Sequence, residues 1–191
     1  FLGCLSCHSE RSEESGEAKN MARRSGVLTG TAGVYYVASQ LAARGFHAAI
    51  THGNAPSVDI LVGLKDGAST LSLQVKTERQ ARRSEGRGSS KSYYYHWRMA
   101  DHSALPNHPN LFFALVNLGL SISENIESGY QALPEVYVLP SKEVHDVSAR
   151  HLATMTKQWQ KWWWWQDPQE LEPYKNNWTL LKDYLAGKVS P

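Results

Sequence analysis

Two short segments in the first half of the chain constrain its fold more than any other feature. The segments Ser57–Val62 and Leu71–Thr77 each read as a short β-strand. Between them, Lys65–Ser69 contains an Asp-Gly step, which favours a hairpin turn when apolar runs flank it. We therefore expect the two segments to pair as antiparallel neighbours in a sheet.

Polar residues in these strands mark a candidate site. Asp59 lies in the first strand, and Gln74 and Lys76 share one face of the second because strand side chains alternate. Charged groups beside buried strand positions cost free energy unless they are paired or bind a metal. Oxygens of Asp59 and Gln74 and the carbonyl of Val75 suit Mg²⁺ or Mn²⁺, and Lys76 could position water or stabilise charge on a phosphate. The simpler interpretation is an ordinary cross-strand pair of Asp59 and Lys76.

The order of these residues resembles the signature of the PD-(D/E)XK nuclease superfamily, which is an Asp, a spacer, then Glu or Gln, any residue and Lys. The match consists of Asp59, Gln74 and Lys76. Three further segments are similar to parts of small bacterial members of this superfamily: Leu28–Phe46, Leu111–Leu118 and Tyr137–Ser141. The resemblance covers roughly residues 26 to 145, and the order of the pieces is stronger evidence than any single piece.

The resemblance implies a fold and an activity. The fold is an α/β, restriction-endonuclease-like or Holliday-junction-resolvase-like domain with an α-β-β-β-α-β core, whose mixed sheet is flanked by helices. The activity is that of a metal-dependent DNA endonuclease, which hydrolyses phosphodiester bonds with Mg²⁺ or Mn²⁺. In this scheme Asp59, Gln74 and Val75 hold the metal, and Lys76 completes a catalytic set with Asp59 and Gln74.

Two positions depart from the family pattern. Val34 stands where related sequences usually carry a Glu that reaches toward the metal, and Gln74 stands where many carry Glu. Asp59 is then the one certain anionic ligand, so we expect weak metal binding unless Asp66 or Glu78 also reaches the site. The alternative function is a catalytically impaired nuclease-fold module that binds nucleic acid or a protein partner.

Positive charge is concentrated directly after the second strand. From Lys76 to Arg98 the chain has seven basic and two acidic residues, a net charge of +5 in a protein whose formal net charge is +2. The stretch from Arg82 to Lys91 reads as a mobile basic loop, which could contact phosphates or could be an ordinary solvated loop. The candidate nucleic-acid-binding residues are Arg79, Arg82, Arg83, Arg87 and Lys91.

The segment Tyr93–Arg98 mixes aromatic and cationic side chains. We expect it to open a helix that extends to about Ala104, with its aromatic face packed on the sheet. The alternative is that these aromatic side chains stack on unpaired bases.

The remaining pattern completes an α/β arrangement. Apolar residues at helical spacing predict a helix over Gly30–Arg44 with Gly45 at its C-cap, and Ser141 is expected to cap a later helix. The predicted strands are Phe46–Thr51, Val58–Leu64, Leu71–Thr77, Leu111–Leu118 and Leu133–Leu139.

We expect three regions along the chain. Residues 1–25 form a disordered or non-native N-terminal segment, residues 26–150 form the core, and residues 151–191 form a Trp-rich helical extension of the same domain. Six of the seven tryptophans lie between Trp159 and Trp178, and a helix cannot bury all of them against one surface. Some of them could therefore contact a second copy of the chain or a protein partner. A body without cysteine beyond Cys7 and the lack of a long apolar run suggest a cytoplasmic protein.

Overall fold

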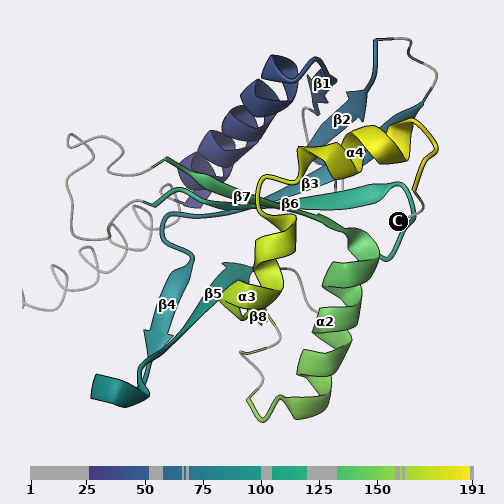
Figure 1. The fold of residues 1–191 in the computed structure, drawn as a ribbon. Coiled ribbons are helices and arrows are strands. Elements are labelled where there is room, and N and C mark those ends of the chain that lie inside the picture. Colours follow the sequence, from purple (N-terminus) through teal and green to yellow (C-terminus); the bar gives the residue numbers. More distant parts are fainter. Residues whose placement is uncertain are drawn as a thin grey trace, which may run out of the picture.

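The computed structural model describes residues 26–51, 58–65, 67, 69–99, 105–119, 133–157, 160 and 162–189. The predicted N-terminal segment, residues 1–25, lies outside the described residues. In chain order the elements (Figure 1) are a helix over residues 26–43, β1 (His47–Ile50), β2 (Ile60–Gly63), β3 (Thr70–Glu78), β4 (Arg82–Glu85), η1 (Gly88–Ser90), β5 (Ser92–Arg98), β6 (Leu111–Asn117), β7 (Glu135–Pro140), α2 (Ser141–Thr154), β8 (Trp163–Gln166), α3 (Pro168–Leu171), η5 (Glu172–Tyr174) and α4 (Trp178–Leu185).

The main sheet has five strands in the order β1-β2-β3-β6-β7. The first three form an antiparallel meander, in which Ile60 pairs with Leu73, so the predicted hairpin is confirmed. Strand β6 then lies parallel to β3, and β7 lies antiparallel to β6. All seven residues of β6 are buried, as its continuous apolar run predicts for a central strand.

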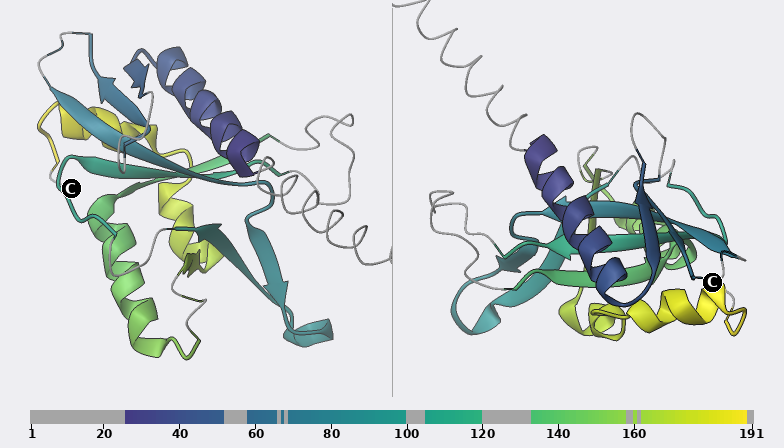
Figure 2. Two further views of the ribbon diagram at one scale, coloured as in Figure 1. Left: turned by 180° about the vertical axis from the view of Figure 1, so that it is seen from behind. Right: turned by 90° about the horizontal axis from the view of Figure 1, so that it is seen from above.

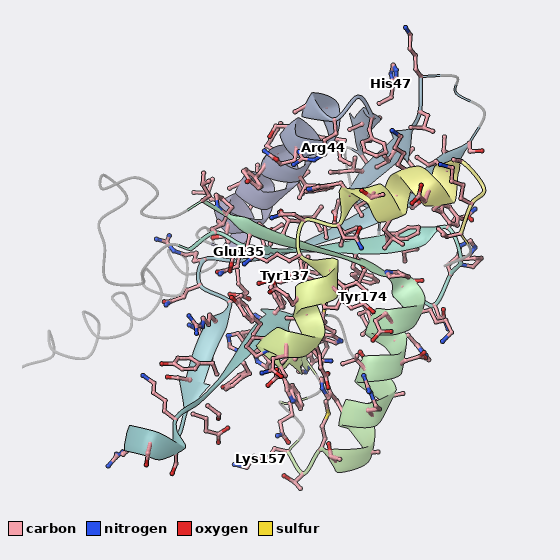
Figure 3. All side chains as sticks on the ribbon, viewed as in Figure 1. Arg44, His47, Glu135, Tyr137, Lys157 and Tyr174 are labelled. Atoms are coloured by element: carbon pink, nitrogen blue, oxygen red, sulfur yellow. The ribbon has the colours of Figure 1, made fainter. Side chains whose placement is uncertain are left out.

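One face of this sheet is covered by helices. Figure 2 shows the helix of residues 26–43 lying across the strands, with α4 on the same side. Val37 and Leu41 of the first helix and Leu181 of α4 are fully buried in one cluster with the inward-facing side chains of β2, β3 and β6. The guanidinium of Arg44 lies 5.1 Å from the ring centroid of Trp178 and joins the ends of the two helices (Figure 3). These helices and one face of the sheet form the first core.

The end of the first helix and its contact with the sheet both depend on glycine. Gly45 has a φ of +84°, and its N–H and that of Phe46 donate to the carbonyls of Ala42 and Leu41, as predicted for a glycine C-cap. Gly33 faces β3 so closely that a Cβ atom added to it would lie 1.8 Å from Oγ1 of Thr77. The helix therefore packs backbone to strand at this point.

The opposite face carries a second core under α2, α3 and a second sheet. This sheet is antiparallel, in the order β4-β5-β8. Trp97 of β5 and Trp164 of β8 are completely buried, and their indole N–H groups donate to the carbonyls of Val116 (2.9 Å) and Val144 (3.2 Å). Both tryptophans are thus fixed by packing and by a hydrogen bond.

A polar network at the start of β7 joins the two sheets (Figure 3). The carboxylate of Glu135 accepts hydrogen bonds from Tyr95 of β5 (3.0 Å), from Asn117 of β6 (3.0 Å) and from Lys175 (2.6 Å). The amide oxygen of Asn117 accepts the backbone N–H of Ala81, which precedes β4 (2.9 Å). The network therefore holds the second sheet against β6 and β7.

The structure corrects three sequence-based predictions. The predicted helix at Tyr93–Ala104 is wrong where the structure describes it, because residues 92–98 form β5. The predicted mobile loop at Arg82–Lys91 instead contains β4 and η1. The predicted Trp-rich helix is wrong at residues 163–166, which form β8, although α3 and α4 follow it. In each case pairing with a neighbouring strand satisfies the hydrogen-bonding groups of the backbone. The β4–β5 hairpin lies between β3 and β6 in the chain, where a helix was expected.

Helix α2 begins where it was predicted, but its first residue has another role. Pro140 occupies the N-cap position and makes no side-chain cap. The hydroxyl of Ser141 instead donates to the carbonyl of His108 (2.7 Å) and accepts the N–H of the same residue (3.0 Å). It fixes the segment that leads into β6.

Candidate active site

The predicted site lies where β2 begins, beside the middle of β3. Asp59 immediately precedes β2, and its backbone N–H donates to the carbonyl of Leu73 at 3.0 Å, which continues the antiparallel ladder. Its carboxylate Oδ2 accepts the backbone N–H of Val75 at 2.7 Å. The Asp59 side chain thus satisfies a backbone N–H of β3 just beyond the residues of β3 that pair with β2.

Lys76 lies within electrostatic range of this carboxylate. Burial lowers the pKa of the Lys76 ammonium, and the negative charge of Asp59 acts in the opposite direction. Gln74 and Lys76 share one face of β3, as predicted, and pair in register with Phe113 and Leu115 of β6. The fold therefore brings Asp59 and Lys76 together and places half-buried Gln74 on the same face.

This face is open on the β2 side and covered on the β6 side. Phe113 and Leu115 are completely buried under the second core, whereas Leu61 of β2, which pairs with Ser72, is 46% exposed. Asp59 and Gln74 lie between these two regions and are half-buried. A ligand could therefore reach the site from the β2 side. Because the site is half-buried, charges in it interact more strongly than in bulk water.

The donors assigned to a metal are one carboxylate, one amide and one backbone carbonyl. A carboxylate offers about four lone-pair positions, and the bond from Val75 uses one of those of Asp59. Within the part of the chain that the structure describes, no group of three His, Cys, Asp or Glu side chains could hold a metal ion. Such a set fits Mg²⁺ or Mn²⁺ that takes most of its ligands from water and from substrate phosphates.

The positions that the family pattern singled out do not add a carboxylate here. Val34 packs against the first core, on the face of the sheet opposite Gln74 and Lys76. Glu78 shares the face of Lys76, and burial raises the pKa of its carboxyl group, while a backbone hydrogen bond from Arg98 and the charges of Arg98 and Arg83 act to lower it. Glu78 therefore interacts with the second sheet.

Asp66, the other carboxylate considered for the metal, lies outside the described residues. Asp59 is thus the carboxylate that the described structure supplies to the site.

The candidate nucleic-acid-binding residues lie on the β4–β5 hairpin and its flanks. The guanidinium of Arg82 and the ammonium of Lys91 lie 4.3 Å and 5.3 Å from the ring centroid of Tyr93. Arg87, in the turn, is exposed, and Arg79, just after β3, is half-buried. The predicted cations are therefore held along a defined hairpin that leaves the end of β3.

Arg83 has a different environment. Its Nε–H donates to Nε2 of His96 at 2.8 Å, and the His96 ring stacks on Trp163 with centroids 4.6 Å apart. Burial and the charge of Arg83 lower the pKa of His96 to about 4. Sequence reasoning missed this group. The signal that could have found it is the alternation of Tyr95 and Trp97 with the more polar His96 and Arg98, which has the period of two residues that is typical of a strand.

No helix in the described ranges is long and apolar enough to cross a membrane. Comparison with known proteins gives no assignment: no protein-family model matches the chain, and neither a curated protein nor a solved structure matches it.

Proposed function

We propose that this protein is a metal-dependent DNA endonuclease with a restriction-endonuclease-like core. The observation that carries the proposal is the position of half-buried Lys76 within electrostatic range of the Asp59 carboxylate, which accepts the backbone N–H of Val75 in β3. Gln74 lies on the same face of that strand. A carboxylate, an amide and a lysine at this spacing suit phosphodiester hydrolysis.

The order of the elements supports the proposed fold. A helix precedes an antiparallel meander of three strands, and a later strand, β6, lies parallel to the third. This is the order expected of an α-β-β-β-α-β core, except that β4 and β5 occupy the crossover described after β3. The candidate site lies on the second and third strands of the meander, as the resemblance implies.

Each side chain has a role that its surroundings support. Asp59, Gln74 and the carbonyl of Val75 would hold Mg²⁺ or Mn²⁺, and the ion would neutralise phosphate charge and acidify a bound water. Burial lowers the pKa of Lys76, and the charge of Asp59 acts to raise it. In its charged form Lys76 would stabilise charge that develops on the scissile phosphate. Cations of the β4–β5 hairpin would hold the DNA backbone without reading its sequence.

A second candidate function is favoured by one observation. In the described residues the metal set has a single carboxylate, and Val34 packs in the core on the far side of the sheet. A site of this kind is also expected of a nuclease-fold module that binds nucleic acid and has lost catalysis.

The test is a cleavage assay on the full chain. Plasmid, single-stranded and branched DNA are incubated with Mg²⁺ or Mn²⁺, with the wild-type protein beside Lys76→Ala and Asp59→Asn. Lys65→Ala is the matched control, because Lys65 is exposed in the turn between β2 and β3. We expect cleavage that requires metal and falls by at least about 100-fold in both site variants, with no change in the control.

Two outcomes would contradict the proposal. Cleavage that survives both site variants would place the chemistry elsewhere or identify a contaminant. No cleavage by the wild-type protein, with DNA binding that weakens as salt rises, would establish the non-catalytic candidate instead.

A further inference from the structure

We propose that the outer face of the second sheet binds unpaired nucleotides of single-stranded DNA by base stacking. We call this surface the aromatic face, and it consists of Arg83, Tyr94, His96, Arg98, Trp163 and Trp165. The inference rests on the proposed function in taking DNA as the ligand, but it assigns the strand state and a different surface.

Strand register places these residues on one side of the sheet. Arg83 pairs with Tyr94, His96 pairs with Trp165, and Arg98 pairs with Trp163. Directly paired residues of antiparallel strands point to the same side, and alternate residues along a strand do the same. The intervening residues Tyr95, Trp97 and Trp164 are buried in the second core, so the aromatic face points away from it.

The aromatic face presents rings whose positions are already fixed. His96 lies nearly parallel to Trp163, at an interplanar angle of 18°, and Tyr94 meets His96 edge-on at 80°. Trp165 stacks on His151 of α2 with centroids 3.9 Å apart. Rigid stacked rings lose little conformational entropy when a further flat ring is added. Tyr94, His96 and Trp163 are each half-buried and so keep accessible surface.

Neutral His96 is part of this arrangement. Because burial and Arg83 lower the pKa of His96 to about 4, its ring is uncharged at neutral pH and accepts the Nε–H of Arg83. The guanidinium of Arg83 is thereby held beside the stacked rings. A cation beside stacked rings can bind the phosphate of a nucleotide whose base stacks on those rings.

Positive charge favours a polyanion as the occupant. The aromatic face includes Arg83 and Arg98, two of the five basic residues in segment 82–98, which has one acidic residue and a net charge of +4. Arg98 is exposed, and its backbone N–H bonds to Glu78, which shares a face of β3 with Lys76.

The aromatic rings decide between single-stranded and duplex DNA. Bases in a duplex already stack on one another, and their faces are closed to protein rings, whereas unpaired bases stack on aromatic side chains without sequence preference. A surface for duplex phosphates alone would need only the cations. The combination of rings and cations thus favours the single strand.

The experiment measures binding by the full chain in EDTA, so that no cleavage occurs. Fluorescence anisotropy is followed for a labelled oligodeoxythymidylate and for a labelled duplex of the same length. We expect the single strand to bind about tenfold more tightly than the duplex or better. Trp163→Leu should weaken single-strand binding about tenfold, whereas Trp163→Phe, which retains a ring, should restore most of the affinity.

Charge is tested with a matched pair of arginines. Arg98→Ala should weaken binding and reduce its salt dependence, while Arg150→Ala, an exposed arginine on α2, should do neither. If near-ultraviolet circular dichroism shows that Trp163→Leu is misfolded, Tyr94→Ser and Arg98→Ala decide the matter.

Three results would overturn the inference: equal affinity for duplex and single strand, unchanged binding by the folded variants of the aromatic face, or no binding of single-stranded DNA. These results are separate from a failure of the proposed function. If the chain cuts DNA but binds both forms equally, the proposed function stands and this inference is refuted. If the chain prefers single strands but cuts nothing, this inference stands and the proposed function is refuted.

Discussion

Replacing Gly33 with alanine tests how closely the first helix packs on β3. A Cβ atom at position 33 would lie 1.8 Å from Oγ1 of Thr77 and 2.8 Å from its Cβ and Cγ2 atoms. Ordinary van der Waals contact begins near 3.4 Å, so the closest pair is too near by about 1.6 Å. Rotation of Thr77 cannot relieve the clash with its Cβ, and the helix or the strand must move.

The expected cost follows from two opposing effects. Overpacking a well-packed contact costs about 1–3 kcal/mol, and the severity of this clash points to the upper end. Alanine in place of glycine inside a helix contributes about 1 kcal/mol in the other direction. We therefore expect Gly33→Ala to lower the free energy of unfolding by about 2 kcal/mol.

Gly30 in the same helix is the matched control. A Cβ atom at position 30 has nothing within 4 Å, so Gly30→Ala should be neutral or stabilise the protein by up to about 1 kcal/mol. Urea unfolding followed by tryptophan fluorescence should separate the two variants by about 3 kcal/mol. In the Gly33→Ala background, Thr77→Ala should recover part of the loss, since it removes two of the three clashing atoms. Equal stability of the two single variants would refute the described packing of the helix on β3.

Two further predictions concern the second core. Burial alone would raise the pKa of Glu135, but hydrogen bonds from Lys175 and other side chains and the charge of Lys175 outweigh it, so its pKa is lowered. The stability that Glu135 contributes is therefore present above its unfolded pKa and is lost as pH falls through its folded pKa. Between these two pKa values, the free energy of unfolding of Glu135→Gln should depend less on pH than that of the wild-type protein. Trp164→Ala should cost about 3–5 kcal/mol in urea unfolding, because Trp164 is fully buried and bonded to Val144, and partly exposed Trp162→Ala should cost less. A comparable loss in both tryptophan variants would contradict the burial of Trp164.

The strands of the main sheet could be predicted because each has a distinct apolar pattern and a clear boundary. The run from Leu111 onward is continuously apolar and proves to be the buried interior strand β6, and β2 pairs with β3 on either side of the segment that contains the Asp-Gly step. Gly45 ends the first helix for the reason that its position suggests. Here local preference and tertiary packing agree, so short-range reasoning was sufficient.

The second sheet could not be predicted in the same way because periodicity is hidden when neighbouring residues are alike. In the run Trp162–Trp165 every residue is an aromatic of the same size, so periods of 2 and 3.6 residues fit equally well. The structure selects period 2, with Trp164 buried and its neighbours more exposed. Strand β4 has no apolar residue at all and depends on pairing with β5.

The site residues could be predicted as neighbours because strand alternation and hairpin pairing are local rules. Their surroundings depend on contacts that the sequence does not show. Burial lowers the pKa of Lys76 against the charge of Asp59, which acts to raise it. The extent of that burial depends on how far the second core extends over β3. The role of Glu78 likewise depends on Arg98, which is distant in sequence.

The hairpin of β4 and β5 explains why a charged surface and a candidate active site adjoin. Its first strand begins four residues after Glu78, and its Trp97 is buried against β6, so its inner side completes the second core. Its outer side faces away from this core and includes Arg83 and Arg98. Cationic groups of this kind are costly to bury in an apolar core. The same hairpin thus closes the second core on one side and carries the proposed binding surface on the other. For this reason, substitutions on the aromatic face should change DNA affinity while leaving the geometry of Asp59 and Lys76 unchanged.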